Sequence, residues 1–273
     1  MKSHEWLVEA EQTLTRADIG TARLDSLILL EDALGVNRAQ VLAHPETNLS
    51  SAQLLKLRKQ LTRRATHEPL AYIRGFSEFY GRQFKVDKRV LQPRPETETM
   101  IALATELKLA PGATVVDVGT GSGCIAITMA LQQPQLQVLA TDNDNNCLVV
   151  ARQNVRALNA KVTCKLGNLT APFSQQPIAV VLANLPYVPD DFQINQAALA
   201  EPRQAIYGGS DGLDIYRQLF KQLTKLPTKP QYVLTEALPP QQAKLAALAK
   251  FHGYQLLKVD DFIQVFQAQA APS

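Results

Sequence analysis

The stretch VVDVGTGSG, Val115 to Gly123, decides the fold of this chain. Its apolar half runs directly into three glycines, Gly119, Gly121 and Gly123, and a helix-like segment begins at Cys124. Glycine lets the backbone turn sharply there and lets a ligand approach it closely. A strand, a glycine-rich turn and a helix in this order predict the first crossover unit of a parallel sheet.

The rest of the carboxy-terminal part repeats this alternation. Apolar runs predict strands at 113–119, 137–142, 161–167, 178–184 and 231–237. Helical segments separate them: one begins at Cys124, others run through Ala151 and Tyr216, and the last spans 241–251. Residues 256–266 add two final strands as a hairpin-like pair. The pattern predicts an α/β fold on a mostly parallel sheet.

The amino-terminal part has helical period and no strand signal. One apolar face is expected before Gly35, and Ser50 or Ser51 is expected to cap the next helix. The first face comprises Leu24, Leu27, Ile28, Glu31 and Leu34, and the second Leu54, Leu57 and Leu61. Aromatics with Gly75 and Gly81 then predict a hairpin. We expect a helical domain at 1–72, a hairpin linker at 73–92 and an α/β domain at 93–273.

Composition excludes several classes of protein. The chain has 273 residues, 46% hydrophobic and 19% charged, so disorder, collagen and coiled coil are excluded. Its net charge, 28 − 25 = +3, does not identify a nucleic-acid partner. Three scattered cysteines and four scattered histidines predict neither disulfides nor a metal site. No apolar window suits a membrane helix and the start is polar, so a cytoplasmic location with no membrane contact is expected.

The glycine turn is paired with an acidic strand end. Its Gly-x-Gly-x-Gly spacing differs from dinucleotide sites, and no phosphate-binding Lys-Ser/Thr follows. Asp142 can accept both hydroxyls of a ribose, whereas Asp144 is expected to cap the next helix. Together these features favour S-adenosylmethionine as cofactor. A tight connection with a capping Asp remains the simpler alternative.

A second turn, Asn184 to Tyr187, ends the apolar run 178–183. Strand ends of an open sheet share one crevice, so this turn is expected beside the glycine loop. The Asn184 side-chain oxygen and the Leu185 carbonyl can accept the two hydrogens of a planar nitrogen, and the Tyr187 ring can pack on the flat group. This arrangement fits methylation of an amide or amino nitrogen. An Asn-x-Pro turn with Tyr187 in the core remains the alternative.

Two distinctive blocks flank these turns: 68–98, which holds Pro-Arg-Pro-Glu-Thr-Glu, and 201–217. With them, the sequence resembles the release-factor glutamine methyltransferases of the HemK/PrmC type. The resemblance implies a helical amino-terminal domain, a hairpin and a Rossmann-like seven-stranded methyltransferase domain with one antiparallel strand. It also implies methylation of the glutamine amide in the Gly-Gly-Gln motif of class I peptide chain release factors. The helical domain is expected to dock that large substrate.

Site residues follow from the turns and the resemblance together, and Asn168 and Leu169 from the resemblance alone. The expected cofactor-binding residues are Gly119, Thr120, Gly121, Ser122, Gly123, Asp142, Asn168, Leu169 and Asn184. The expected catalytic residues are Asn184, Pro186 and Tyr187. The expected substrate-binding residues are Asn184, Leu185, Pro186 and Tyr187.

The chain departs from the family pattern in places. Leu185 replaces the usual proline, which adds a backbone N–H that needs a partner. The other departures are Gln92, Leu169, Leu238 and the ending VDDFIQVFQ, 259–267.

Rival functions stay open. They are methylation of ribosomal RNA adenine, which shares the Asn-Leu-Pro-Tyr turn, methylation of a ribosomal-protein glutamine, and cofactor binding without catalysis. No direct nucleic-acid requirement is expected, because the loose basic cluster is interpreted as a solvated face. That cluster comprises Arg63, Arg64, Arg82, Lys85, Lys88 and Arg89.

Overall fold

The computed structural model describes residues 1–269, and the chain divides into two units. One unit is Met1–Gly75 together with Ile194–Ala200. The other comprises 76–193 and the chain from Glu201 onward. Within the described residues, no helix is long and apolar enough to cross a membrane.

The amino-terminal unit is helical. Its helices are α1 (Ser3–Arg16), α2 (Ala22–Leu34), α3 (Arg38–Ala43), α4 (Ser51–Ala65), α5 (Leu70–Arg74) and the short α9 (Gln196–Leu199). Gly35 ends α2 in the left-handed conformation, as predicted, and Ser50 caps α4 by accepting a hydrogen bond from the Gln53 N–H. Trp6 is fully buried in the core of this unit.

The predicted apolar face of α2 is wrong in part. Leu24 is 43% exposed, whereas Leu29 and Leu30, which were not included, are completely buried. The reason is that α2 packs against α1, α3 and α4, so its buried side is wider than one stripe. Even a charged residue is enclosed there: Asp25 pairs with Arg64 at 2.7 Å, and both side chains are buried.

A two-stranded hairpin links the units, as expected. Strand β1 (Phe76–Phe79) pairs antiparallel with β2 (Arg82–Lys85). The hairpin is fixed to the carboxy-terminal unit because Asn154 exchanges two hydrogen bonds with the Lys85 backbone. Phe79 and Phe84 pack edge to face beneath it, with ring centroids 6.1 Å apart.

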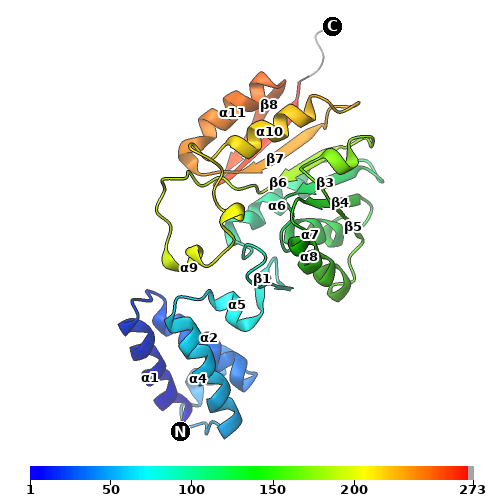
Figure 1. Ribbon diagram of the computed structural model, residues 1–273. Helices are drawn as coiled ribbons and strands as arrows, with labels where there is room; N and C mark the ends of the chain where they lie inside the picture. The colour runs from blue at the N-terminus through cyan, green and yellow to red at the C-terminus, as the bar shows by residue number, and fades with distance from the viewer. Residues whose placement is uncertain (270–273) are drawn as a thin grey trace. The chain divides into compact units, whose positions relative to one another are not determined.

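The carboxy-terminal unit is built on a seven-stranded sheet of order β5-β4-β3-β6-β7-β9-β8 (Figure 1). The strands are β3 (Thr114–Val118), β4 (Gln137–Asp142), β5 (Val162–Leu166), β6 (Val180–Ala183), β7 (Tyr232–Glu236), β8 (Tyr254–Asp260) and β9 (Ile263–Ala268). Among these, β9 alone runs against the rest and pairs antiparallel with β7 and β8. The predicted α/β fold with one antiparallel strand is therefore confirmed.

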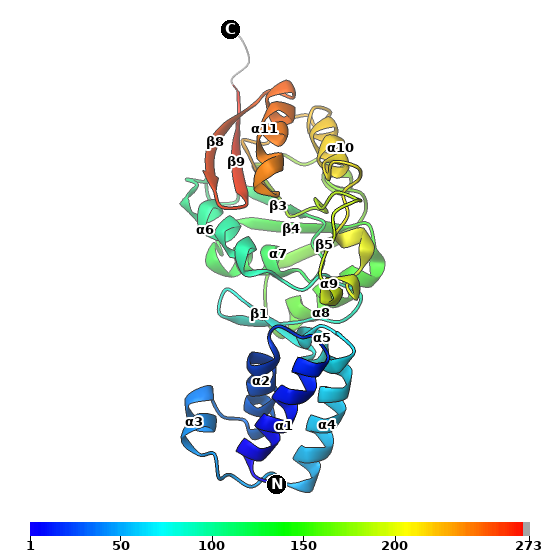
Figure 2. The ribbon, with the colours of Figure 1, turned by 90° about the vertical axis from the view of Figure 1, so that its left-hand side faces the viewer.

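Helices cover both faces of the sheet (Figure 2). They are α6 (Glu98–Glu106), α7 (Cys124–Gln132), α8 (Asn145–Ala157), α10 (Asp214–Leu223) and α11 (Gln242–Phe251). Side chains alternate along each strand, so Val115 packs on the face with α6 and α7, and Val116 on the face with α10 and α11. Strands β4 and β5 lie on one side of β3, and β6, the next strand along the chain, lies on its other side, so the strand order reverses at β3. In open sheets of this kind, ligands bind where the strand order reverses.

Candidate active site

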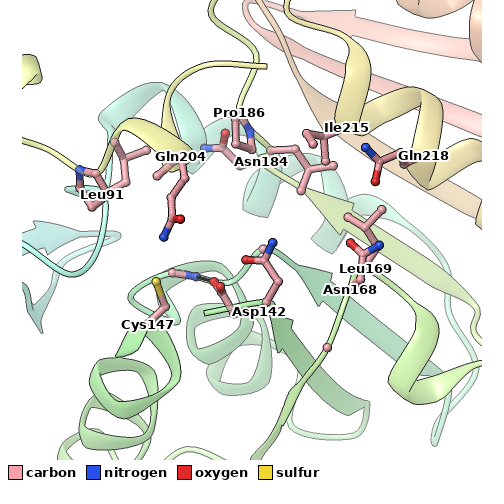
Figure 3. A pocket seen from close by; sticks show the side chains of 17 residues that line it. Leu91, Asp142, Cys147, Asn168, Leu169, Asn184, Pro186, Gln204, Ile215 and Gln218 are labelled. Atoms are coloured by element: carbon pink, nitrogen blue, oxygen red, sulfur yellow. Dashed lines mark hydrogen bonds between the residues drawn. The ribbon is translucent and has the colours of Figure 1, made fainter. Parts of the chain in front are cut away.

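A cavity lies at the carboxyl ends of β3, β4, β5 and β6, within the carboxy-terminal unit (Figure 3). It is concave and partly open to solvent, a shape that suits a small-molecule cofactor. Figure 3 shows Asn184 and Pro186 on one side and Asp142 and Cys147 on the other. The lining residues are Leu91, Gly119, Gly121, Asp142, Asn143, Cys147, Gly167, Asn168, Leu169, Asn184, Leu185, Pro186, Pro202, Gln204, Ala205, Ile215 and Gln218.

The glycine loop contributes Gly119 and Gly121 to the lining. Gly119 has φ +70°, a conformation that favours glycine, and a Cβ there would crowd Leu185 Cδ2 at 3.0 Å. Thr120, Ser122 and Gly123 are not among the lining residues. Thr120 and Ser122 are buried, with the Thr120 hydroxyl donating to Asp117, and Gly123 forms the left-handed cap at the start of α7.

Asp142 ends β4 and faces the cavity. Its Oδ2 accepts a hydrogen bond from the Gly121 N–H and its Oδ1 one from the Asp144 N–H, both at 2.9 Å. Burial raises the pKa of this carboxyl, and the two backbone donors oppose the rise. Each oxygen keeps a lone pair for a hydroxyl ligand. Asp144 caps α8 by accepting from the Asn146 N–H, as predicted.

Asn168 and Leu169 follow β5 and line the far end of the cavity. The Leu169 backbone has φ +52°, an unusual conformation for a residue with a side chain. The Thr141 hydroxyl holds it by donating to the Leu169 carbonyl at 2.7 Å. The neighbouring Gln218, on α10, lines the same end.

The turn after β6 brings Asn184, Leu185 and Pro186 to the cavity. Asn184 Nδ2 donates to the hydroxyl oxygen of Thr97 at 2.9 Å. Tyr187 is not among the lining residues; its hydroxyl donates to Glu236 Oε1 at 3.0 Å. Burial, together with the Glu236 charge, raises the pKa of Tyr187.

The extra N–H of Leu185 has a specific partner. It donates to the hydroxyl oxygen of Tyr216 at 3.3 Å, and Tyr216 is completely buried on α10. The Tyr216 hydroxyl in turn lies 2.5 Å from the Glu236 carbonyl and 3.1 Å from the Ala183 carbonyl. One buried hydroxyl thus satisfies the backbone at the ends of β6 and β7.

The Pro-Arg-Pro-Glu-Thr-Glu block, Pro93 to Glu98, lies beside the site and bonds to three other segments. Arg94 pairs with the buried Glu201 at 2.7 Å, and Glu98 accepts from the Tyr80 N–H in the hairpin. Thr97 accepts from Asn184, as described above. Both distinctive blocks of the sequence therefore meet beside the cavity, although most of their residues do not line it.

Several lining residues were not predicted. They are Leu91, Asn143, Cys147, Gly167, Pro202, Gln204, Ala205, Ile215 and Gln218. Five of them lie in the distinctive blocks, which were the available signal: Leu91 in 68–98, and Pro202, Gln204, Ala205 and Ile215 in 201–217. Asn143, Cys147, Gly167 and Gln218 come from loops and helices that only the sheet topology brings together.

The basic cluster expected as a solvated face is partly occupied by ion pairs. Arg63 pairs with Glu68, Arg89 with Asp87, and Arg64 is buried against Asp25. These arginines are consequently not free phosphate ligands.

Comparison with known proteins identifies the family. Residues 5–75 match the model of the PrmC N-terminal domain, and residues 98–206 match that of the methyltransferase small domain. The release factor glutamine methyltransferase of Geobacter sulfurreducens is 37% identical over 224 residues, which cover 81% of this chain and 76% of that protein. The protein of the same name from Deinococcus radiodurans is 33% identical and covers 93% and 92%. The chain belongs to the release factor glutamine methyltransferase family.

The fold agrees with this membership. A solved structure of the hMettl16 catalytic domain, in complex with the MAT2A 3'UTR hairpin 1, superposes with a TM-score of 0.56 over 82% of each chain. At 14% identity this likeness concerns the fold alone. The match to the PrmC N-terminal domain lies in the helical unit.

Proposed function

We propose that this protein transfers a methyl group from S-adenosylmethionine to the side-chain amide nitrogen of glutamine in the Gly-Gly-Gln motif of class I release factors. The observation that carries the proposal is the Asn184 amide. Its nitrogen is engaged by Thr97, which leaves its oxygen for a ligand in the cavity above the glycine loop. Membership of the family supports the same conclusion.

The cavity residues fit such a cofactor. Asp142 retains acceptor capacity for the ribose hydroxyls, and Asn168 and Leu169 would hold the adenine at the other end. Gly119 and Gly121 allow close approach to the loop. When bound, the cofactor supplies a methyl group on a positively charged sulfur.

The substrate amide needs help because its nitrogen lone pair is delocalised. The Asn184 Oδ1 and the Leu185 carbonyl would each accept one N–H of the glutamine amide, which orients the nitrogen for attack in line with the methyl group. Pro186 stiffens the turn, and the Tyr187 ring would pack on the flat amide. The glutamine nitrogen would gain the methyl carbon in exchange for one of its own protons, which it then releases.

The direct test is incubation with labelled S-adenosylmethionine and a class I release factor, followed by mass spectrometry of the Gly-Gly-Gln peptide. One methyl group on the glutamine is expected. Ribosomal protein and ribosomal RNA serve as the other substrates, and labelling of either one in place of the release factor contradicts the proposal.

Asn184→Ala separates catalysis from cofactor binding. Turnover should fall by about a hundredfold or more, the usual scale for losing one preorganised hydrogen-bonding group. Calorimetry should find the cofactor affinity nearly unchanged. Wild-type turnover in this variant would remove Asn184 from the mechanism.

The helical unit would serve as the docking surface, because one amide in a cavity offers little area for selecting a single glutamine. A protein lacking residues 1–75 should lose activity on the whole release factor and keep it on a short Gly-Gly-Gln peptide. Equal activity of the truncated and full-length proteins on the whole factor would argue against docking. We also propose a cytoplasmic location, where translation factors are present.

A further inference from the structure

We propose that Thr97 and Glu236 are positioning residues that set which end of the Asn184 amide faces the cavity. The inference rests on the proposed function and assigns two further residues to it. Both lie outside the turn that carries Asn184, and neither lines the cavity.

The three side chains converge from separate elements. Thr97 ends the short helix Pro95–Thr97 before α6 and is 1% exposed. Glu236 ends β7 and is also 1% exposed. Ala183 of β6 pairs with Thr235 of β7, so the residues that follow them, Asn184 and Glu236, are neighbours in the register. The sheet register therefore fixes this arrangement.

Among Thr97, Asn184 and Glu236, each hydrogen bond has a defined donor and acceptor. A carboxylate can only accept, and Glu236 Oε1 already accepts from the Tyr187 hydroxyl at 3.0 Å. Its other oxygen, Oε2, is buried with no partner in hydrogen-bonding geometry. Thr97 accepts from Asn184 Nδ2 through its oxygen, so its own proton remains available. Thr97 and Asn184 lie near enough to Glu236 for their hydrogen bonding to oppose the rise that burial causes in its pKa.

This direction decides the orientation of the amide. A threonine hydroxyl alone can donate or accept, and would tolerate Asn184 in either orientation. With its proton directed toward the Glu236 carboxylate, the hydroxyl can only accept from Asn184. The amide nitrogen is then held inward and Oδ1 faces the cavity. The reverse orientation would present N–H groups to the N–H groups of the substrate.

The experiment compares Thr97→Val, which keeps the shape and removes the hydroxyl, with Thr97→Ser, which keeps the hydroxyl. Thr105→Val, a partly exposed position on the following helix α6 whose hydroxyl donates to the Ala102 carbonyl, is the matched control. We expect kcat of Thr97→Val to fall about 10- to 100-fold, since small misplacements of a reacting pair have effects of this size. Thr97→Ser should stay within about threefold of wild type, Thr105→Val should be unchanged, and cofactor Kd should be the same in all four proteins. Wild-type kcat in Thr97→Val, or equal losses in the Val and Ser variants, would overturn the proposal.

Glu236→Gln tests the source of the direction. A glutamine can donate to Thr97, which frees the threonine proton to bind Asn184 Oδ1 and turns the amide over. We expect a kcat loss comparable to that of Thr97→Val, with KM and cofactor Kd little changed. A uniform loss of cofactor affinity and stability, with wild-type kcat at saturation, would indicate a merely structural role.

A readout independent of activity separates this inference from the proposed function. The side-chain NH2 resonances of Asn184, identified by their loss in Asn184→Ala, should be a single pair with slowed hydrogen exchange in the wild type. They should shift and exchange faster in Thr97→Val. If wild-type protein fails to methylate the release factor, the proposed function fails, while these resonances still decide the hydrogen-bond network. Unaltered resonances in Thr97→Val would refute it.

Discussion

Replacing Tyr216 with phenylalanine removes one buried hydroxyl and nothing else. The ring keeps its place on α10, so no cavity is created and the apolar contacts remain. What is lost is the acceptor of the Leu185 N–H and the donor to the carbonyl that ends β7. The variant therefore measures how much the Tyr216 hydroxyl contributes to stability when position 185 is leucine, with a backbone N–H, in place of the usual proline.

The magnitude follows from burial. Leu185 is 3% exposed and Tyr216 is completely buried, so water cannot replace the missing partner. A buried donor left unsatisfied costs about 1–3 kcal/mol, and we expect the free energy of unfolding to fall by that amount. In a Leu185→Pro background the N–H no longer exists. The cost of Tyr216→Phe should then be smaller by about 1 kcal/mol or more.

Urea unfolding of the four proteins of this cycle, followed by circular dichroism, is the assay. Trp6 is the single tryptophan and lies in the helical unit, so its fluorescence identifies transitions of that unit. Leu185→Pro has a cost of its own because the Leu185 side chain packs against Gly119, and the cycle cancels that cost. If Tyr216→Phe costs the same in both backgrounds, the hydroxyl does not serve the Leu185 N–H and the reasoning is wrong.

Two further changes test the cavity residue Asp142 and the buried carboxyl of Asp117. Asp142→Ala should weaken cofactor binding by about 1–3 kcal/mol, because the ribose hydroxyls lose their acceptor; calorimetry measures this, and an unchanged Kd removes Asp142 from the site. Burial raises the pKa of Asp117 from 3.8 to about 7, so between these values the folded state keeps a proton that the unfolded chain releases. The free energy of unfolding should therefore fall as pH rises through this window and level off above it. Unfolding experiments at pH about 5 and about 7.5 measure this change, which should be smaller in Asp117→Asn. An equal change in both proteins contradicts the raised pKa of Asp117.

Local patterns predicted much of the carboxy-terminal unit. The apolar run before Gly119, the acidic end of β4 and the cap at Asp144 each have a local physical cause, and each is found in the structure. The Leu185 N–H was likewise predicted to need a partner. The face of α2 was mispredicted because three neighbouring helices surround it, which one stripe of apolar residues cannot reveal.

The side chains that organise the turn could not be read from the sequence. Thr97 and Asn184 are 87 positions apart, and Tyr187 and Glu236 are 49 apart. Their contact depends on β6 lying between β3 and β7, which is a property of sheet order. The partner of the Leu185 N–H was hidden for the same reason, since Tyr216 reaches it from a helix on the sheet face.

The most distinctive block of the sequence, Pro93 to Glu98, therefore has a role that its position alone would not suggest. None of its residues lines the cavity, yet Arg94, Thr97 and Glu98 bond respectively to Glu201, to the Asn184 turn and to the hairpin. An amide acceptor must present an oxygen, and free rotation of the asparagine amide would present nitrogen half of the time. A block that holds the Asn184 amide from behind can thus be as specific to the chemistry as the turn itself.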